Sequence, residues 1–231
     1  MANRADGIIL ALSHETKDYE HIKMIQESGT PIVLFDRTTN ELNVSRVVTD
    51  GVTAAFQAVQ HLVSEGCQKI ALLCGPENVG IGGNRMEGYE KAMEANHLPA
   101  KPELICHCSD FTVEAGKEAT RQLLSRKERP DAIFGITDDL AIGAIEAIKE
   151  KGLNIPEDIA IVGFSNTKRS RYMNPTVSSI NQFPEKIGRA AAELLFDQIL
   201  NSKHAQIKKE IINCELIVRE SSDRRCRHDR C

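Results

Sequence analysis

The sequence contains no tryptophan, and it lacks the features that place a chain in or across a membrane. No apolar run approaches the roughly 20 residues that a helix needs to span a bilayer. The stretch Met1–Asp6 lacks the apolar core of a secretory signal peptide. We therefore predict a cytoplasmic protein.

An excess of basic charge is also absent. Lys and Arg number 29 against 33 Asp and Glu, which gives a net charge of -4. Nucleic acid attracts a concentrated basic surface, and the chain as a whole offers none, so DNA binding must be local or lie outside this sequence. The 41% of hydrophobic and 27% of charged residues are typical of a globular protein with one large domain or two small ones.

The seven cysteines are odd in number and follow no regular spacing, so a disulfide scaffold is not expected. Cys106-His107-Cys108 alternates along a predicted strand, which places both thiols on one face and the imidazole on the other. The tail carries a second Cys/His group within residues 226–231. Neither group has a partner pair at the spacing of a zinc site, so we predict no metal and no cofactor.

Motifs of catalysis are missing as well, since G-x-S-x-G, H-E-x-x-H and G-x-x-x-x-G-K-[ST] do not occur. Gly80–Gly83 follows a predicted strand, but Arg85 stands where a dinucleotide-binding loop has its last glycine. We favour a flexible lip over a cleft, with nucleotide binding as the alternative. Asp138 and Asp139 begin a predicted helix, where acids serve as N-cap and first-turn residues. We predict that the chain is not an enzyme.

The sequence does contain a regular succession of short apolar runs and longer amphipathic stretches. Runs that are continuous rather than alternating indicate strands buried on both faces of a parallel sheet. The predicted strands are Gly7–Leu12, Pro31–Phe35, Val44–Val48, Lys69–Leu73, Leu104–His107, Ala132–Ile136, Ile159–Phe164 and Ile211–Val218. The predicted helices are Asp18–Glu27, Val52–Glu65, Arg85–Ala95, Val113–Leu124, Asp138–Lys151 and Pro184–Leu200. This order predicts an α/β fold with parallel sheets flanked by helices, followed by a disordered tail at 221–231.

Polar residues follow many of these strands, which is where ligands bind in open α/β sheets. They are Ser13 and His14, Asp36 and Arg37, Thr49 and Asp50, Thr137 and Asp138, and Ser165 and Asn166. Arg85 opens a predicted helix against the helix dipole; it is either a surface arginine or a clamp for ligand hydroxyls or a carboxylate. Asp36 either caps or pairs with Arg37, or accepts ligand hydroxyls. The polar strand ends together predict a binding cleft.

A series of segments, in order along the chain, carries a family likeness. They are Pro31–Arg37 (PIVLFDR), Val47–Asp50 (VVTD), Lys69–Pro76 (KIALLCGP), Arg85–Tyr89 (RMEGY), Pro130–Phe134 (PDAIF), Ile155–Phe164 (IPEDIAIVGF) and Leu216–Ser221 (LIVRES). Each segment alone is a weak signal, but as a set, from about Asp6 to Ser221, they resemble the LacI/GalR family of bacterial transcription repressors.

The resemblance implies a two-lobed, periplasmic-binding-protein-like fold. The N-terminal lobe would comprise residues 1–49 and 181–210, and the C-terminal lobe residues 50–180 and 211–220. It also implies a homodimer, a preceding helix-turn-helix head that binds operator DNA, and a small effector such as a sugar or nucleobase. The effector would lie between the lobes and control DNA binding allosterically.

Residue by residue, the resemblance implies effector contacts at Asp36, Arg85, Phe111, Thr137 and Ser165, with the Phe111 ring stacking on the effector. Ser165 departs from the family, which usually has an aspartate there, and Thr137 stands where many members have asparagine. These changes remove a charge from the cleft and leave the effector's identity open.

The sequence also lacks the head and the first strand–helix–strand–helix of the family's first lobe. We therefore expect an incomplete first lobe, an open edge on the strand at residues 7–12, and no operator binding by this chain itself. A periplasmic sugar-binding protein of the same fold is the alternative, but it would need a signal peptide. A doubly wound phosphate-using transferase would need a phosphate loop or a catalytic pair.

Overall fold

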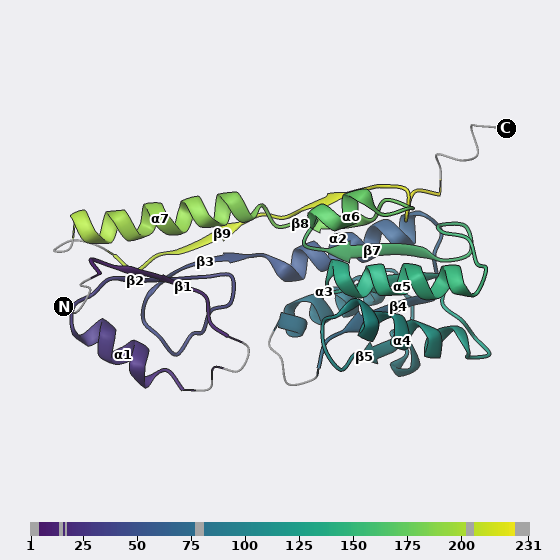
Figure 1. Ribbon diagram of the computed structural model, residues 1–231, viewed down its shortest axis with the longest axis horizontal. Helices are drawn as coiled ribbons and strands as arrows, with labels where there is room; N and C mark the ends of the chain where they lie inside the picture. The colour runs from purple at the N-terminus through teal and green to yellow at the C-terminus, as the bar shows by residue number, and fades with distance from the viewer. Residues whose placement is uncertain (1–4, 14–15, 17, 77–80, 202–205, 225–231) are drawn as a thin grey trace. The chain divides into compact units, whose positions relative to one another are not determined.

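The computed structural model describes residues 5–13, 16, 18–76, 81–201 and 206–224 (Figure 1). The chain divides into two compact units, each built from segments that are distant in sequence. Unit 1 comprises Met1–Asp50 and Phe183–Asn213, and unit 2 comprises Gly51–Gln182 and Cys214–Cys231. The chain therefore passes between the units after Asp50, after Gln182 and after Asn213.

Unit 1 has a parallel sheet in the order β1-β2-β3-β9. Its strands are β1 (Ile8–Leu10), β2 (Ile32–Phe35), β3 (Ser45–Thr49) and β9 (Lys209–Ile212). Two helices, α1 (Glu20–Glu27) and α7 (Pro184–Leu200), pack on opposite faces. Successive residues of β2 point to opposite faces of the sheet. Ile32 and Leu34 pack with Ile22 of α1, whereas Val33 packs with Ala191 of α7. Among the described residues β1 is an edge strand that pairs only with β2.

Unit 2 has a larger sheet in the order β10-β8-β7-β6-β4-β5, and only the β10–β8 pair is antiparallel. Its strands are β4 (Ile70–Cys74), β5 (Ile105–His107), β6 (Ala132–Gly135), β7 (Ala160–Phe164), β8 (Ser178–Asn181) and β10 (Glu215–Ile217). Its helices are α2 (Gly51–Ser64), α3 (Ile81–Ala95), the 3-10 turn Pro102–Leu104, α4 (Val113–Leu124), α5 (Asp138–Glu150) and α6 (Lys168–Tyr172). The predicted α/β fold with parallel sheets and flanking helices is confirmed.

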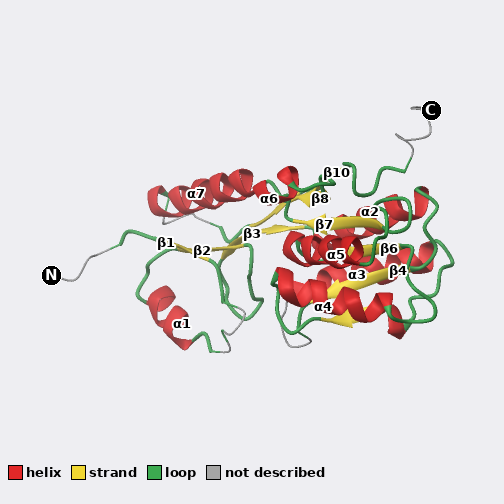
Figure 2. Ribbon diagram, turned by 45° about the vertical axis from the view of Figure 1, so that its right-hand side comes forward, coloured by secondary structure: helices red, strands yellow, loops and turns green. Residues whose placement is uncertain are grey.

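The core of unit 2 follows from its sequence. Every residue of β4, β6 and β7 is buried, which explains why these strands are continuous apolar runs. Figure 2 shows these strands between two pairs of helices, α2 with α3 and α4 with α5. Glycines let each pair approach closely: a Cβ at Gly88 would lie 2.3 Å from the Val52 carbonyl oxygen, and one at Gly143 would lie 2.1 Å from that of Val113.

Three elements differ from the sequence-based expectation. Strand β8 was not predicted, because three of the four residues in its segment SSIN are polar, yet Ser178 and Ser179 are fully buried. The run Ile211–Val218 is not one strand: it contributes to β9 in unit 1 and to β10 in unit 2, with the chain passing between units after Asn213. The short helix α6 was also missed.

The tail does not become disordered at residue 221. Ser221 and Ser222 are fully buried. The backbone of Ser221 donates to the Thr176 carbonyl and accepts from the Ile161 N–H at 2.7 Å, while its Oγ accepts from the Ser178 N–H at 2.8 Å. Residues 225–231, which include the tail Cys/His group, lie outside the described residues. No helix in the described part of the chain is long and apolar enough to cross a membrane.

Candidate ligand-binding site

The loops that follow β4, β6 and β7 form one edge of the unit 2 sheet, which we call the carboxyl edge. These strands are parallel neighbours, so their carboxyl ends lie on the same side of the sheet. Three of the predicted contact residues follow these strands or reach them: Thr137 comes after β6, Ser165 comes directly after β7, and Arg85 reaches both loops from α3.

Arg85 joins the β6 and β7 ends of the carboxyl edge. Its side chain is buried, with 9% of the residue exposed. Its Nη1 donates to the carbonyl oxygen of Ile136, and its guanidinium carbon lies 3.8 Å from the centroid of the Phe164 ring. A buried guanidinium stacked on an aromatic face is held in one orientation. The interpretation of Arg85 as a surface arginine is therefore wrong.

The start of α3 corrects two further expectations. The helix begins at Ile81, so Arg85 lies inside it and does not open it. Gly82 and Gly83 are helical residues rather than parts of a flexible lip or of a phosphate loop. Gly80 lies outside the described residues.

Thr137 and Ser165 present hydroxyl groups at the carboxyl edge. Thr137 is the N-cap of α5, and its Oγ1 accepts the Leu140 N–H at 3.3 Å. The Oγ of Ser165 donates to Oε1 of Gln182 at 3.1 Å. Ser165 has a φ of 112° and Asn166 has a φ of 48°, which are conformations that favour glycine. The loop after β7 is thus strained at two consecutive residues.

Phe111 lies between β5 and α4 in sequence, and its ring packs just beyond the end of β4. An ideal Cβ at Gly75 would lie 2.3 Å from Cε1 and from Cζ of the Phe111 ring, so the ring packs directly on this glycine. Only glycine leaves room for the ring there. The Phe111 side chain is half-buried, and part of it remains accessible.

Asp36 belongs to unit 1, where it follows β2. It is exposed, has a φ of 58°, and donates its N–H to the Val47 carbonyl at 3.2 Å. Arg37 donates from Nε to the Leu12 carbonyl at 2.6 Å. Thr49 and Asp50 are half-buried at the end of β3. His14 lies outside the described residues.

Asp138 and Asp139 lie in the first turn of α5, whose N-cap is Thr137, so neither aspartate is the N-cap, and their surroundings differ. Asp138 is 1% exposed, its Oδ1 accepts the Ser179 hydroxyl, and its Oδ2 accepts the Thr167 N–H at 2.6 Å. The side chain of Asp139 is 50% exposed and lies 3.8 Å from Arg169. Asp138 therefore ties the start of α5 to β8 and to the loop after β7.

Sequence reasoning assigned no role to Gln182, Ser179 and Arg219, which surround the loop after β7. Nη2 of Arg219 donates to Oδ1 of Asn166 at 2.7 Å, and the Ser179 Oγ accepts the Asn166 N–H at 2.9 Å. Arg219 lies in the segment LIVRES that carries the family likeness, and the serine pair lies between the apolar residues Val177 and Ile180. An arginine directly after a predicted strand and two adjacent serines were thus the sequence signals for these supporting residues.

The cysteines form no site in the described residues. No group of three or more His, Cys, Asp and Glu side chains there could hold a metal ion. Sγ of Cys74 lies 3.4 Å from Nδ1 of His107, which places this imidazole beside a thiol of the neighbouring strand. Burial raises the pKa of the Cys67 and Cys108 thiols to about 12, so both stay protonated and are weak nucleophiles near neutral pH.

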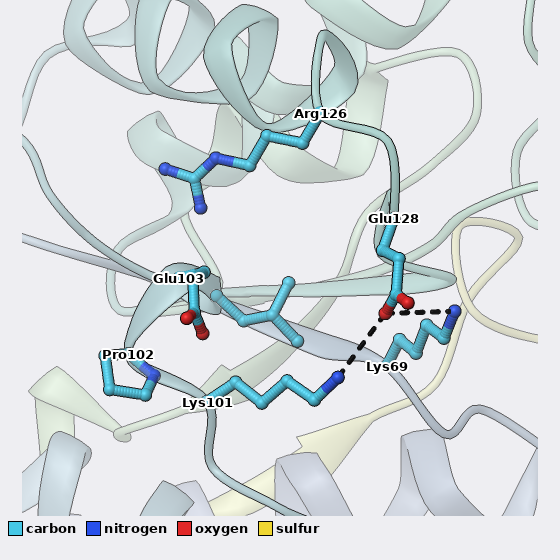
Figure 3. A pocket seen from close by; sticks show the side chains of 7 residues that line it. Lys69, Lys101, Pro102, Glu103, Arg126 and Glu128 are labelled. Carbon is cyan, nitrogen blue, oxygen red and sulfur yellow. Dashed lines mark hydrogen bonds and ion pairs between the residues drawn. The ribbon is translucent and has the colours of Figure 1, made fainter.

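A cavity of about 610 Å³ lies at the opposite edge of the sheet, near the amino ends of β4 and β5. Figure 3 shows that Lys101 and Glu128 face each other across it, with Arg126 above. The Glu128 carboxylate lies 3.4 Å from Lys101 Nζ and 3.7 Å from Lys69 Nζ. The hydrogen bond from Lys101 lowers the pKa of Glu128. The side chains of Lys69, Lys101 and Glu128 are about half exposed or more, so solvent screens the attraction between their charges.

Comparisons with known proteins agree with this architecture. The periplasmic binding protein-like domain matches residues 59–222. The transcriptional repressor CytR of Escherichia coli strain K12 is 36% identical over 197 residues, which cover 85% of this chain and 57% of the repressor.

Solved structures extend the match to the fold. A LacI-family regulatory protein from Chloroflexus aggregans is 32% identical, with a TM-score of 0.85 over 94% of this chain and 76% of that one. The complex of the transcriptional regulator CelR with cellobiose is also 32% identical, with a TM-score of 0.85 over 95% of this chain and 67% of that one.

An α/β core with its polar residues at the carboxyl edge defines a ligand-binding domain of the periplasmic binding protein-like class. The chain belongs to the LacI family of transcriptional regulators, of which it represents the effector-binding core. It spans about three fifths of the length of the first curated relative, CytR, since 57% of that protein is covered.

Proposed function

We propose that this chain is the effector-binding and dimerisation core of a bacterial LacI-type regulator and binds a sugar-like small molecule at the carboxyl edge. The observation that carries the proposal is the placement of Arg85. Its buried guanidinium contacts Ile136, just after β6, and Phe164, the last residue of β7, and these two residues directly precede the hydroxyl-bearing Thr137 and Ser165.

The proposed contacts suit a polyhydroxylated ligand. The Arg85 guanidinium supplies donors in a planar fork, and the hydroxyls of Thr137 and Ser165 can donate or accept. The face of the Phe111 ring suits the apolar face of a sugar. We also propose a ligand contact for the carboxylate of Asp36, which follows β2 in unit 1.

Regulation would follow from an equilibrium between two conformations of the protein. A ligand that binds one conformation more tightly favours it, and linkage transmits this preference to DNA-binding heads in a homodimer in the cytoplasm. Coupling of this kind typically amounts to about 1–3 kcal/mol. We propose no catalytic role, because both carboxylate oxygens of Asp138 accept hydrogen bonds from Thr167 and Ser179.

The test is thermal unfolding and calorimetric titration with cellobiose and ribose, a disaccharide and a monosaccharide. A sugar at 100 times its dissociation constant should stabilise the protein by about 2.7 kcal/mol. Arg85→Ala should lose about 1.5–3 kcal/mol of binding free energy, because a charged hydrogen-bonding group is removed. The control is Arg121→Ala, since Arg121 is an exposed ion-paired arginine on α4. Unchanged affinity in Arg85→Ala would contradict the site.

A further inference from the structure

The loop after β7 adopts a conformation that its own residues do not favour. Ser165 and Asn166 both have positive φ angles, of 112° and 48°. Neither residue is glycine, and each such conformation persists only where the surrounding structure holds it. The proposed ligand contact Ser165 therefore depends on whatever holds this loop.

Two kinds of contact hold the loop. Asp138 and Ser179 bind its backbone, since Ser179 Oγ accepts the Asn166 N–H at 2.9 Å and Asp138 Oδ2 accepts the Thr167 N–H at 2.6 Å. Arg219 binds its side chain, since Nη2 donates to the Asn166 Oδ1 at 2.7 Å.

Arg219 is itself fixed on the sheet. Its Nη1 donates to the carbonyl oxygen of Val177, just before β8, and its backbone N–H donates to the Ser178 Oγ at 2.7 Å. The two arms of one planar guanidinium thus connect the loop after β7 to the start of β8. A lysine has a single ammonium group on a flexible stem, and it cannot reproduce this fork.

We propose that Arg219 is a positioning residue for the ligand-binding site: it fixes Asn166 and thereby sets the orientation of Ser165 toward the ligand. This inference rests on the proposed function for its ligand readout. The inference adds Arg219, which follows β10, to a site whose other residues come earlier in the sequence.

The chain provides a matched control in Arg224. This arginine lies five positions further along the same segment, is half-buried like Arg219, and also donates from its guanidinium to two acceptors, the carbonyl oxygens of Pro156 and Asp131 at 2.9 Å each. Asp131 immediately precedes β6, so Arg224 acts at the amino end of the sheet. Arg219→Lys and Arg224→Lys therefore remove comparable interactions at different places.

The experiment compares the affinity of both variants for cellobiose and ribose by calorimetry and their amide hydrogen exchange by NMR. We expect Arg219→Lys to bind at least tenfold more weakly, and Arg224→Lys to bind like the wild type. Asn166→Gly in the Arg219→Lys background should restore part of the affinity, because glycine adopts the positive φ without support. Equal affinity losses in the two lysine variants, or no rescue by Asn166→Gly, would overturn the proposal.

The exchange measurement needs no ligand. In Arg219→Lys the amides of Asn166 and Thr167 should exchange faster, while in Arg224→Lys these amides should keep their wild-type rates. Unchanged rates at both amides in Arg219→Lys would overturn the positioning role. A wild-type protein that binds neither sugar contradicts the proposed sugar binding, and the exchange rates then still decide whether Arg219 fixes the loop.

Discussion

Neighbouring residues of the same type can have different roles, and the two aspartates at the start of α5 show why. Asp138 is buried and accepts hydrogen bonds from β8 and from the loop after β7. Asp139 points to solvent, where its ion pair with Arg169 is screened. Their difference comes from helix geometry, since adjacent positions on a helix face different directions.

We predict that Asp138→Ala destabilises the fold by about 1.5–3 kcal/mol, because it removes a charged acceptor and leaves the buried Ser179 hydroxyl without its partner. Asp139→Ala should change stability by less than about 1 kcal/mol. Urea denaturation of both variants measures the difference. Similar losses in the two variants would show that the buried hydrogen bonds of Asp138 contribute little.

At the residue level the sequence predicted which positions lie at the carboxyl edge, but not how they are held. Strand ends could be located from apolar runs, so Thr137 and Ser165 were found. The support from Arg219 could not be predicted, because it depends on an antiparallel pairing between β10 and β8 that no local pattern records. Asn166 and Arg219 are 53 residues apart in sequence.

At the scale of elements, close helix pairs determine the packing of unit 2. Gly143 of α5 faces α4, where an added Cβ would lie 2.1 Å from the Val113 carbonyl oxygen and 2.6 Å from the Lys117 N. Gly188 of α7 has nothing within 4 Å of an added Cβ. Both glycines are helical, so they share the same intrinsic cost and differ only in their neighbours.

Gly143→Ala should therefore destabilise the protein by about 1–3 kcal/mol, since helices α4 and α5 must separate. Gly188→Ala should stabilise it by up to about 1 kcal/mol, because alanine restricts the unfolded chain and favours the helix. Thermal unfolding followed by circular dichroism distinguishes the two. A neutral Gly143→Ala would mean that α4 and α5 adjust without cost.

Elements were predictable where one pattern dominates. Helices α4 and α7 have the predicted limits because their amphipathic periodicity is uninterrupted. Strand β8 was missed because Ser178 and Ser179 satisfy their polar groups within the protein: Ser178 Oγ donates to the Arg219 carbonyl, and Ser179 Oγ to Asp138. A buried serine and an exposed one look the same in a sequence.

At the scale of the whole molecule, the two units differ in how their sheets are covered. Strands β6 and β7 have a neighbouring strand on each side and are fully buried. Strand β1 is a three-residue edge strand with partial exposure. Within the part of the chain that the structure describes, the edge of β1 away from β2 has no pairing strand, and an edge of this kind lowers local stability.

Hydrogen exchange measured by mass spectrometry should therefore be slowest in peptides that cover β6 and β7, and fastest among the strands in the peptide that covers β1. The reason is that core strands open only in global unfolding, whereas edge strands open locally. Stronger protection of β1 than of β6 would show that another chain covers this edge in solution.

The distribution of strands between units has a consequence for synthesis. β9 completes the sheet of unit 1 and β10 that of unit 2, and only two residues, Asn213 and Cys214, separate them. Translation proceeds from the N-terminus, and domains ordinarily fold as they emerge. Here neither sheet can be completed until residues 209–217 have been made. Both units must therefore await the same segment, and a nascent chain that stalls before residue 209 contains neither finished unit.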